Sequence, residues 1–161
     1  MVRAVDRALL RMLRTRGHGP ATERAVLAFT RSGEHGLLWL AGSAAGAAFD
    51  PGRRPLYLRA IRVVAGSYLT NIAMKYAVRR KRPVLEGLPA LSSTVTSLSY
   101  PSAHSTTSFA AARVLSRELP AGPLYVCAAA MALSRIYAGV HYPTDIAAGA
   151  ALGTAMTEVI P

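Results

Sequence analysis

Four stretches of mainly apolar residues most limit the folds open to this chain. They cover residues 36–49, 55–78, 124–140 and 146–160, and a more mixed stretch of helical pattern covers 105–119. A helix that crosses a bilayer alone needs about 20 residues, so only the second stretch is comfortably long enough. The others are short and rich in small residues, which suits helices packed tightly against one another. The sequence therefore predicts an all-α fold built as a bundle.

Composition places this bundle in a membrane. The chain has 161 residues, enough for one domain, and 52% of them are hydrophobic, with a mean hydropathy of +0.26. These values are high for a soluble protein. We therefore expect an integral-membrane bundle of five or six helices in the plasma (inner) membrane.

Two of the apolar stretches carry glycines four residues apart. Gly42 and Gly46 form one pair, and Gly149 and Gly153 form the other. Small residues at this spacing let helix backbones approach closely in lipid. These faces could pack helices within the chain or join copies in a homo-oligomer.

Residues 1–20 differ from the rest of the chain. Apolar residues recur there at helical spacing with arginines mostly between them, a pattern typical of an amphipathic helix at a membrane interface. A frayed basic tail is the alternative. We expect the helical membrane domain to cover residues 21–161. Residues 21–31 are too short and too charged to predict as a span, so five and six spans both remain open.

Three clusters of polar residues interrupt the apolar pattern, each beside an expected helix end. In chain order they are Lys75 with Arg82, then Ser102, Ala103 and His104, then Arg135, His141 and Asp145. If successive helices alternate in direction, all three clusters lie at the same end of the bundle. The sequence therefore predicts one site assembled from distant segments.

The cations of these clusters suit a tetrahedral oxyanion, with phosphate as the first candidate. Lys75, Arg82 and Arg135 supply three positive charges, and the two arginines have planar forks that bind oxyanions through paired hydrogen bonds. The backbone amides of residues 102–104, at an expected helix start, would add donors.

The two histidines can divide the chemistry of phosphate-ester cleavage. One can attack phosphorus while the other protonates the departing oxygen. Asp145 follows His141 by four residues, so its carboxylate can accept a ring N–H and set the tautomer of that histidine.

Three spaced motifs give the chain a resemblance to the type 2 phosphatidic acid phosphatase (PAP2) superfamily. KYAVRRKRP resembles its K-x6-R-P motif, PSAH resembles P-S-G-H, and SRIYAGVHYPTD resembles S-R-x5-H-x3-D. The motifs run in the expected order from Lys75 to Asp145. The superfamily also includes soluble acid phosphatases and vanadium haloperoxidases.

The resemblance implies roles for the clustered residues. It makes His141 the nucleophile that forms a phosphohistidine, Asp145 its orienting partner and His104 the general acid. It implies phosphate binding, without metal or cofactor, by Lys75, Arg82, Ser102, Ala103 and Arg135. Ala103 stands where the family usually has glycine, a difference that matters if the backbone there needs a positive φ.

The remaining charged residues have structural interpretations. Arg79, Arg80 and Lys81 form a run that we expect at the lipid headgroups. His18 and His35 lie in glycine-flanked loops without a catalytic partner at a suggestive spacing.

The sequence thus predicts a membrane phosphatase that removes a phosphomonoester or diphosphate from a lipid through a phosphohistidine. The short chain, rich in Ala and Arg, looks most like the small superfamily members that act on decaprenylphosphoryl-5-phosphoribose in cell-wall arabinan precursor synthesis. Undecaprenyl diphosphate, phosphatidate and phosphatidylglycerol phosphate are the alternative substrates. None of the residues above selects among them.

Two other classes of function remain open, namely a vanadium-haloperoxidase-like oxidoreductase and a non-catalytic lipid-binding protein. Nucleic-acid binding, which a net charge of +11 would allow, is disfavoured because the cations lie in the N-terminal segment and around the site. The side that the site faces also remains open. Five spans and the positive-inside rule place it in the cytoplasm, whereas six spans place it outside.

Overall fold

The chain folds into a helical bundle in the computed structural model, which describes residues 2–161, with side chains from residue 4 onward. This part of the chain contains seven α-helices: α1 (Val2–Arg14), α2 (Pro20–Ser32), α3 (Leu37–Phe49), α4 (Arg54–Val78), α5 (Ala103–Leu115), α6 (Ala121–Tyr137) and α7 (Pro143–Val159). Short 3-10 turns at Glu34–Gly36 and Pro51–Arg53 precede α3 and α4. The described residues form no β-strand, only one isolated bridge between Lys81 and Leu98. The all-α prediction is confirmed.

Prolines mark where several of these helices begin. Pro20, Pro55 and Pro143 lie at the first or second position of α2, α4 and α7. A proline there removes only an N–H that has no acceptor inside the helix, and its φ already suits the helix. Pro20 therefore favours a helix start, and residues 20–32, which are too charged to predict as a span, form a helix.

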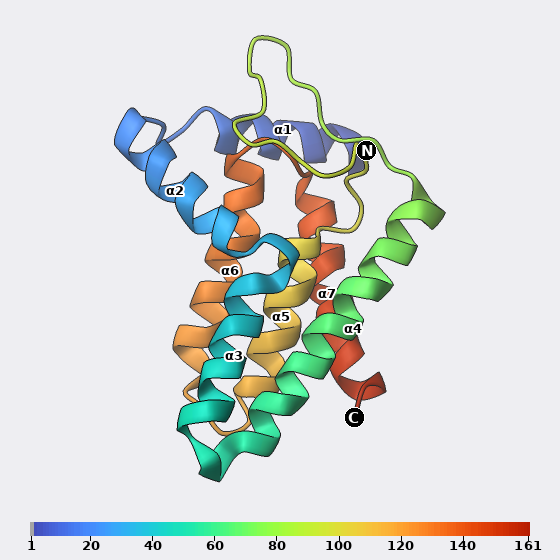
Figure 1. Cartoon of the computed structure of the whole chain (residues 1–161). Helices are drawn as coiled ribbons and strands as arrows, with labels where there is room; N and C mark the ends of the chain where they lie inside the picture. Colours follow the sequence, from blue (N-terminus) through green and yellow to red (C-terminus); the bar gives the residue numbers. More distant parts are fainter. Residues whose placement is uncertain (1) are drawn as a thin grey trace.

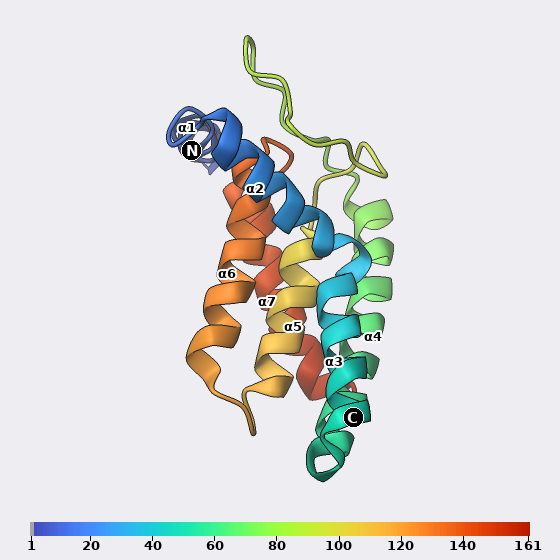
Figure 2. The same ribbon diagram turned by 60° about the vertical axis from the view of Figure 1, so that its left-hand side comes forward.

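Helix α5 is the centre of the bundle, with α3, α4, α6 and α7 around it (Figures 1 and 2). Its inner residues are small, and Ala110, Ala111 and Ala112 are fully buried. Small side chains let the neighbouring helices come close, so the centre of the bundle is filled largely by backbone and methyl groups.

The glycines of α7 produce the closest of these approaches. A Cβ added to Gly153 would lie 2.1 Å from the carbonyl oxygen of Thr106 in α5, and one on Gly149 would lie 2.6 Å from that of Ser102. The expected close packing therefore occurs within the chain, and this face is not free to join a second copy. Of the other pair, Gly46 lies against the Tyr57 ring and Gly42 faces open space.

Helix α1 lies crosswise over one end of the bundle, against α6 and α7 (Figures 1 and 2). Its inner face carries Asp6, Leu10 and Arg14, all buried and spaced four residues apart. The apolar residues on its outer side remain exposed: Val5, Leu9, Met12 and Leu13. The N-terminal amphipathic helix is thus present, and it docks on the bundle through a face that is partly charged.

Within residues 2–161, no helix combines the length and the hydropathy of a membrane span. The longest helix, α4, has 25 residues but carries Arg59, Arg62 and Lys75 along its length.

The connection between α4 and α5 lies at the same end as α1 and rises beyond the bundle (Figure 1). Backbone hydrogen bonds close its base: the Arg82 N–H donates to the Ser97 carbonyl at 3.2 Å, and the Ser99 N–H donates to the Arg80 carbonyl at 2.8 Å. The end of α4, the start of α5 and the α6–α7 junction meet beneath it. The predicted convergence of the three polar clusters is confirmed.

Candidate active site

The three polar clusters meet around a cavity of about 430 Å³ beneath this connection. Six of the predicted site residues line it: Lys75, Arg82, Ala103, His104, Arg135 and His141. The other two, Ser102 and Asp145, lie behind the wall and are fully buried.

Backbone carbonyl groups hold two of the three cations. The Nζ of Lys75 donates to the Pro101 carbonyl at 2.7 Å. Arg82 donates from Nε to the Thr96 carbonyl at 2.8 Å and from Nη1 to the Val140 carbonyl at 2.9 Å. Burial lowers the pKa of Arg82 to about 10, so its guanidinium remains charged at neutral pH.

Arg135 reaches the cavity from the last turn of α6. Its Nη1 donates to the hydroxyl of Thr30 in α2 at 2.8 Å, whereas its Nε is buried without a partner among the described residues. An unpaired N–H of a buried guanidinium is costly, and an oxyanion in the cavity would satisfy it. The three cations therefore suit a tightly held anion.

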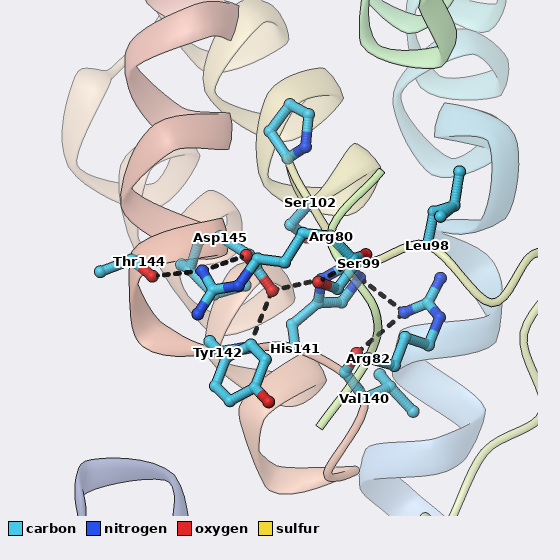
Figure 3. Close-up of polar contacts among 12 residues, drawn as sticks. Arg80, Arg82, Leu98, Ser99, Ser102, Val140, His141, Tyr142, Thr144 and Asp145 are labelled. Carbon is cyan, nitrogen blue, oxygen red and sulfur yellow. Dashed lines mark hydrogen bonds and ion pairs between the residues drawn. The ribbon is translucent and has the colours of Figure 1, made fainter. Parts of the chain in front are cut away.

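The two ring nitrogens of His141 have different surroundings (Figure 3). Nε2 accepts a hydrogen bond from Arg82 Nη1 at 3.1 Å, and Nδ1 lies 3.5 Å from Oδ2 of Asp145. Because arginine only donates, Nε2 carries the lone pair and Nδ1 carries the proton. The 3.5 Å separation is at the long limit for a hydrogen bond, as catalytic contacts often are without substrate.

The protonation state of His141 suits nucleophilic attack. Burial lowers its pKa to about 3; the hydrogen bond to Asp145 opposes this shift, while the charges on Arg82 and Lys75 reinforce it. The ring is therefore neutral at pH 7, with its lone pair on the nitrogen beside the cations. This is the form of imidazole that can attack an electrophile.

The second histidine of the cavity, His104, is held by the last turn of α2. Its Nε2 donates to the Thr30 carbonyl at 3.0 Å, since a carbonyl only accepts. Nδ1 is therefore the ring atom left to exchange a proton with a bound substrate.

Ser102 and Ala103 form the start of α5. Ser102 caps the helix: its hydroxyl accepts from a first-turn amide at 3.5 Å, and its own N–H donates to the Asp145 carbonyl at 3.0 Å. Ser102 is not among the residues that line the cavity, so a direct contact of its hydroxyl with phosphate stays a prediction. Ala103 is not among the non-glycine residues with positive φ in the described chain, which are His35 and Arg79. Alanine therefore fits this position without backbone strain.

Arg80 is a site residue that the sequence interpretation missed. Its Nη1 donates to Oδ1 of Asp145 at 2.9 Å, its Nη2 donates to Oδ2 of Asp6 at 2.8 Å, and its guanidinium stacks 4.0 Å from the Tyr142 ring centroid (Figure 3). Placing Arg80 with an exposed charge run was therefore wrong, although Arg79 and Lys81 are exposed. No signal in the run distinguishes the inward arginine from its neighbours.

Thr30 and His35 were also missed. Thr30 is fully buried and joins His104 to Arg135, but a lone threonine in a short helix carries no functional pattern. His35, expected to be structural, lines the cavity together with Glu34 and Tyr68, and its Nδ1 is hydrogen-bonded to the Tyr68 hydroxyl. These residues line the same cavity as the cations.

Fold and site together define the class: an all-helical phosphatase whose oxyanion site joins the ends of several helices. The chain belongs to the PAP2 superfamily, whose family model matches residues 56–161. The predictions of this superfamily and of a phosphoric ester hydrolase are confirmed.

Two relatives are similar in sequence over most of the chain. A decaprenylphosphoryl-5-phosphoribose phosphatase from Mycolicibacterium smegmatis is 40% identical over 135 residues, which are 81% of this chain and 72% of the relative. The protein of the same name from Mycobacterium tuberculosis is 38% identical over 143 residues, covering 87% of this chain and 77% of the relative.

Two solved structures are also similar. The crystal structure of Aquifex aeolicus LpxE has a TM-score of 0.79 at 23% identity, covering 94% of this chain and 92% of that one, a likeness of fold alone. The transmembrane PAP2-type phosphatidylglycerolphosphate phosphatase from Bacillus subtilis has a TM-score of 0.76 at 25% identity, covering 99% and 84%.

Proposed function

We propose that this chain removes the 5-phosphate of decaprenylphosphoryl-5-phosphoribose, acting as a lipid phosphatase in cell-wall precursor synthesis. The observation that carries the reaction is a neutral His141, with its Nε2 lone pair beside three cations in one cavity. The choice of substrate is supported by the two mycobacterial relatives, which are named for this activity.

The first chemical step is attack of His141 on phosphorus. The bond from Nε2 to phosphorus forms while the bond from phosphorus to the ribose oxygen breaks. His104 acts here in its doubly protonated form, which the negative charge of the bound phosphate favours: Nδ1 gives its proton to that oxygen, while the Nε2 N–H continues to donate to the Thr30 carbonyl. Asp145 accepts the Nδ1 hydrogen of His141 and stabilises the positive charge that develops there.

The second step is hydrolysis of the phosphohistidine. Water attacks phosphorus, His104 takes a proton from the water, and the bond to His141 Nε2 breaks. Phosphate then leaves and the neutral ring is restored. The same histidine acts as acid in one step and as base in the next.

The cations hold the transferring group throughout both steps. Lys75, Arg82 and Arg135 face the non-bridging oxygens, and the first amides of α5, at Ala103 and His104, have no intrahelical acceptors and add donors. The incoming phosphate takes over the contact that Arg82 Nη1 makes to Nε2 of His141. Charge stabilisation of this kind is the main source of catalysis in phosphoryl transfer.

Three further residues that line the cavity suit a sugar. Glu34, His35 and Tyr68 offer a carboxylate, a ring nitrogen and a hydroxyl, groups that hydrogen-bond to ribose hydroxyls.

The substrate places this activity at a membrane surface. We propose that helices α3–α7 form a membrane-embedded bundle and that α1 lies at the interface. Exposed apolar residues on α1, with Arg7 and Arg11 on the same helix, suit an anionic bilayer. The transmembrane PAP2 protein of similar fold supports the bundle.

The test is phosphate release by the detergent-purified chain in EDTA from a panel of substrates. The panel contains decaprenylphosphoryl-5-phosphoribose, phosphatidate, phosphatidylglycerol phosphate, undecaprenyl diphosphate and ribose 5-phosphate. We expect the first to have the highest kcat/KM and His141→Ala to release none. A preference for a glycerol lipid or a diphosphate would refute the proposed substrate, and equal release by His141→Ala would refute the proposed mechanism.

A further inference from the structure

Arg80 binds two buried carboxylates at once, and only one of them faces a catalytic residue. Asp145 and Asp6 are 0% and 2% exposed, and the two guanidinium nitrogens of Arg80 lie 2.9 Å and 2.8 Å from them. Asp6 comes from α1 and Asp145 from the first turn of α7. One side chain thus joins the crosswise helix to the carboxylate behind His141.

The contacts of Asp145 fix both of its oxygens. Oδ1 accepts from Arg80, while Oδ2 accepts from the Tyr142 N–H at 2.9 Å and faces Nδ1 of His141. With Arg80 on one oxygen, the other is the only one that can turn toward the imidazole. Arg80 therefore sets the orientation of the carboxylate (Figure 3).

Asp6 is equally well fixed. Its Oδ1 accepts from the Thr144 N–H at 3.0 Å, and its Oδ2 accepts from the Thr144 hydroxyl at 2.6 Å as well as from Arg80. Thr144 in turn accepts from Arg80 Nη1 at 2.7 Å. Arg80, Asp6 and Thr144 thus close a ring of hydrogen bonds, and Asp145 is joined to this ring through Arg80 Nη1. Because every member has a partner, the arrangement is rigid.

The charge on Asp6 matters as well as its geometry. Arg80 alone beside Asp145 would neutralise that carboxylate and weaken its attraction for a positively charged His141. A second carboxylate on the same guanidinium shares its charge, so Asp145 keeps more of its negative character. Arg80 and Asp6 together thus let Asp145 stabilise the imidazolium that forms when His141 attacks.

We propose that Arg80 and Asp6 are positioning residues for the reaction. They fix the orientation of the Asp145 carboxylate and preserve its negative charge, and thereby couple α1 to the catalytic histidine. This inference rests on the proposed role of His141. Neither residue lines the cavity, so neither is expected to touch the substrate. Their loss should slow the chemical step and leave phosphate binding by Lys75, Arg82 and Arg135 intact.

The variants that test this are Arg80→Gln, Arg80→Lys and Asp6→Asn. Matched controls with the same change in charge are Lys81→Gln and Glu86→Gln, since both side chains are exposed. Steady-state kinetics are measured on the lipid substrate and on p-nitrophenyl phosphate. Fluorescence of Trp39, the one tryptophan of the chain, verifies that each variant is folded.

We expect kcat to fall on the order of 10- to 100-fold in Arg80→Gln and Asp6→Asn, the range found when groups that orient metal-binding histidines are lost. KM and inhibition by inorganic phosphate should stay unchanged. Arg80→Lys should recover little, because one ammonium cannot bind both carboxylates. The double variant Arg80→Gln/Asp6→Asn should be no slower than the slower single variant, since the two act through one carboxylate.

Three results would overturn the inference: a kcat within about twofold of native in folded Arg80→Gln, a raised KM at unchanged kcat, or additive losses in the double variant. If Arg80→Gln does not fold, Asp6→Asn decides alone. A native chain that hydrolyses p-nitrophenyl phosphate but not the lipid would refute the proposed substrate while leaving this test in force. A native chain inactive on both would refute the proposed function itself.

Discussion

Replacing Gly153 with alanine should separate the two helices that bring Asp145 and His104 together. The added Cβ would lie 2.1 Å from the Thr106 carbonyl oxygen and 3.0 Å from the Ala110 nitrogen, both in the backbone of α5. Backbone atoms cannot rotate away as a side chain can. Helices α5 and α7 must therefore move apart by roughly 1 Å at this point.

The size of the effect follows from two opposing contributions. Overpacking of this kind costs about 1–3 kcal/mol. The better helix propensity of alanine returns up to about 1 kcal/mol. The free energy of unfolding should therefore fall by about 2 kcal/mol at the upper end, which lowers Tm by roughly 4–8 °C for a domain of this size. A displacement of about 1 Å at a catalytic group can also reduce kcat on the order of 100-fold.

The control is Gly42→Ala, because a Cβ on Gly42 in α3 meets nothing within 4 Å. Thermal unfolding is followed by the fluorescence of Trp39, whose Nε1 donates to the Ser108 hydroxyl in α5 at 2.8 Å and so reports on packing around that helix. Gly42→Ala should raise Tm slightly and leave kcat unchanged. Equal Tm and kcat in the two variants would show that α5 and α7 do not depend on this contact.

Three further variants test the site. Arg135→Lys should raise KM at least about tenfold with a smaller effect on kcat, because an ammonium cannot bind phosphate and the Thr30 hydroxyl as a fork; an unchanged KM in steady-state kinetics would contradict this. Thr30→Val keeps the carbonyl that holds His104 but leaves Arg135 Nη1 without its acceptor, whereas the Ser134 hydroxyl keeps the Met131 carbonyl; the free energy of unfolding should fall by about 1–3 kcal/mol. Unfolding curves that match those of native protein would show that Arg135 Nη1 finds another partner. His141 has its pKa lowered by burial from 6.5 to about 3, so between these values the unfolded chain binds more protons and stability is lost as pH falls. Thermal scans at pH 6.5 and pH 4 should therefore show a larger loss for native protein than for His141→Ala, and equal losses would refute the buried neutral ring.

The positions of helices and motifs were predictable because each has a local signal. Apolar stretches and prolines fixed α3–α7 to within a few residues, and the charged residues too costly to bury without a purpose identified the site. Helix α2 was harder to predict, because its sequence pattern alone does not distinguish a short surface helix from a membrane span.

The sequence did not reveal the features that depend on where a side chain points. Arg79 ends α4 with a φ of 55°, so the residues after it leave the helical spacing and their orientation cannot be read from periodicity. Arg80 therefore turns inward from a run that looks uniformly exposed. Asp6 did carry a signal, since it is the only acid in α1 and lies on the same face as Leu10 and Arg14. A lone carboxylate on the inner face of a basic helix indicates a buried partner.

The most direct test of the account is to trap the phosphorylated enzyme. Native protein is mixed with substrate, quenched in base within the first turnover, and digested for mass spectrometry, with His141→Ala treated identically. We expect one phosphoryl group on His141 in native protein and none in the variant. Rapid phosphate release without any phosphorylated peptide, or phosphorylation of His104 instead, would contradict it.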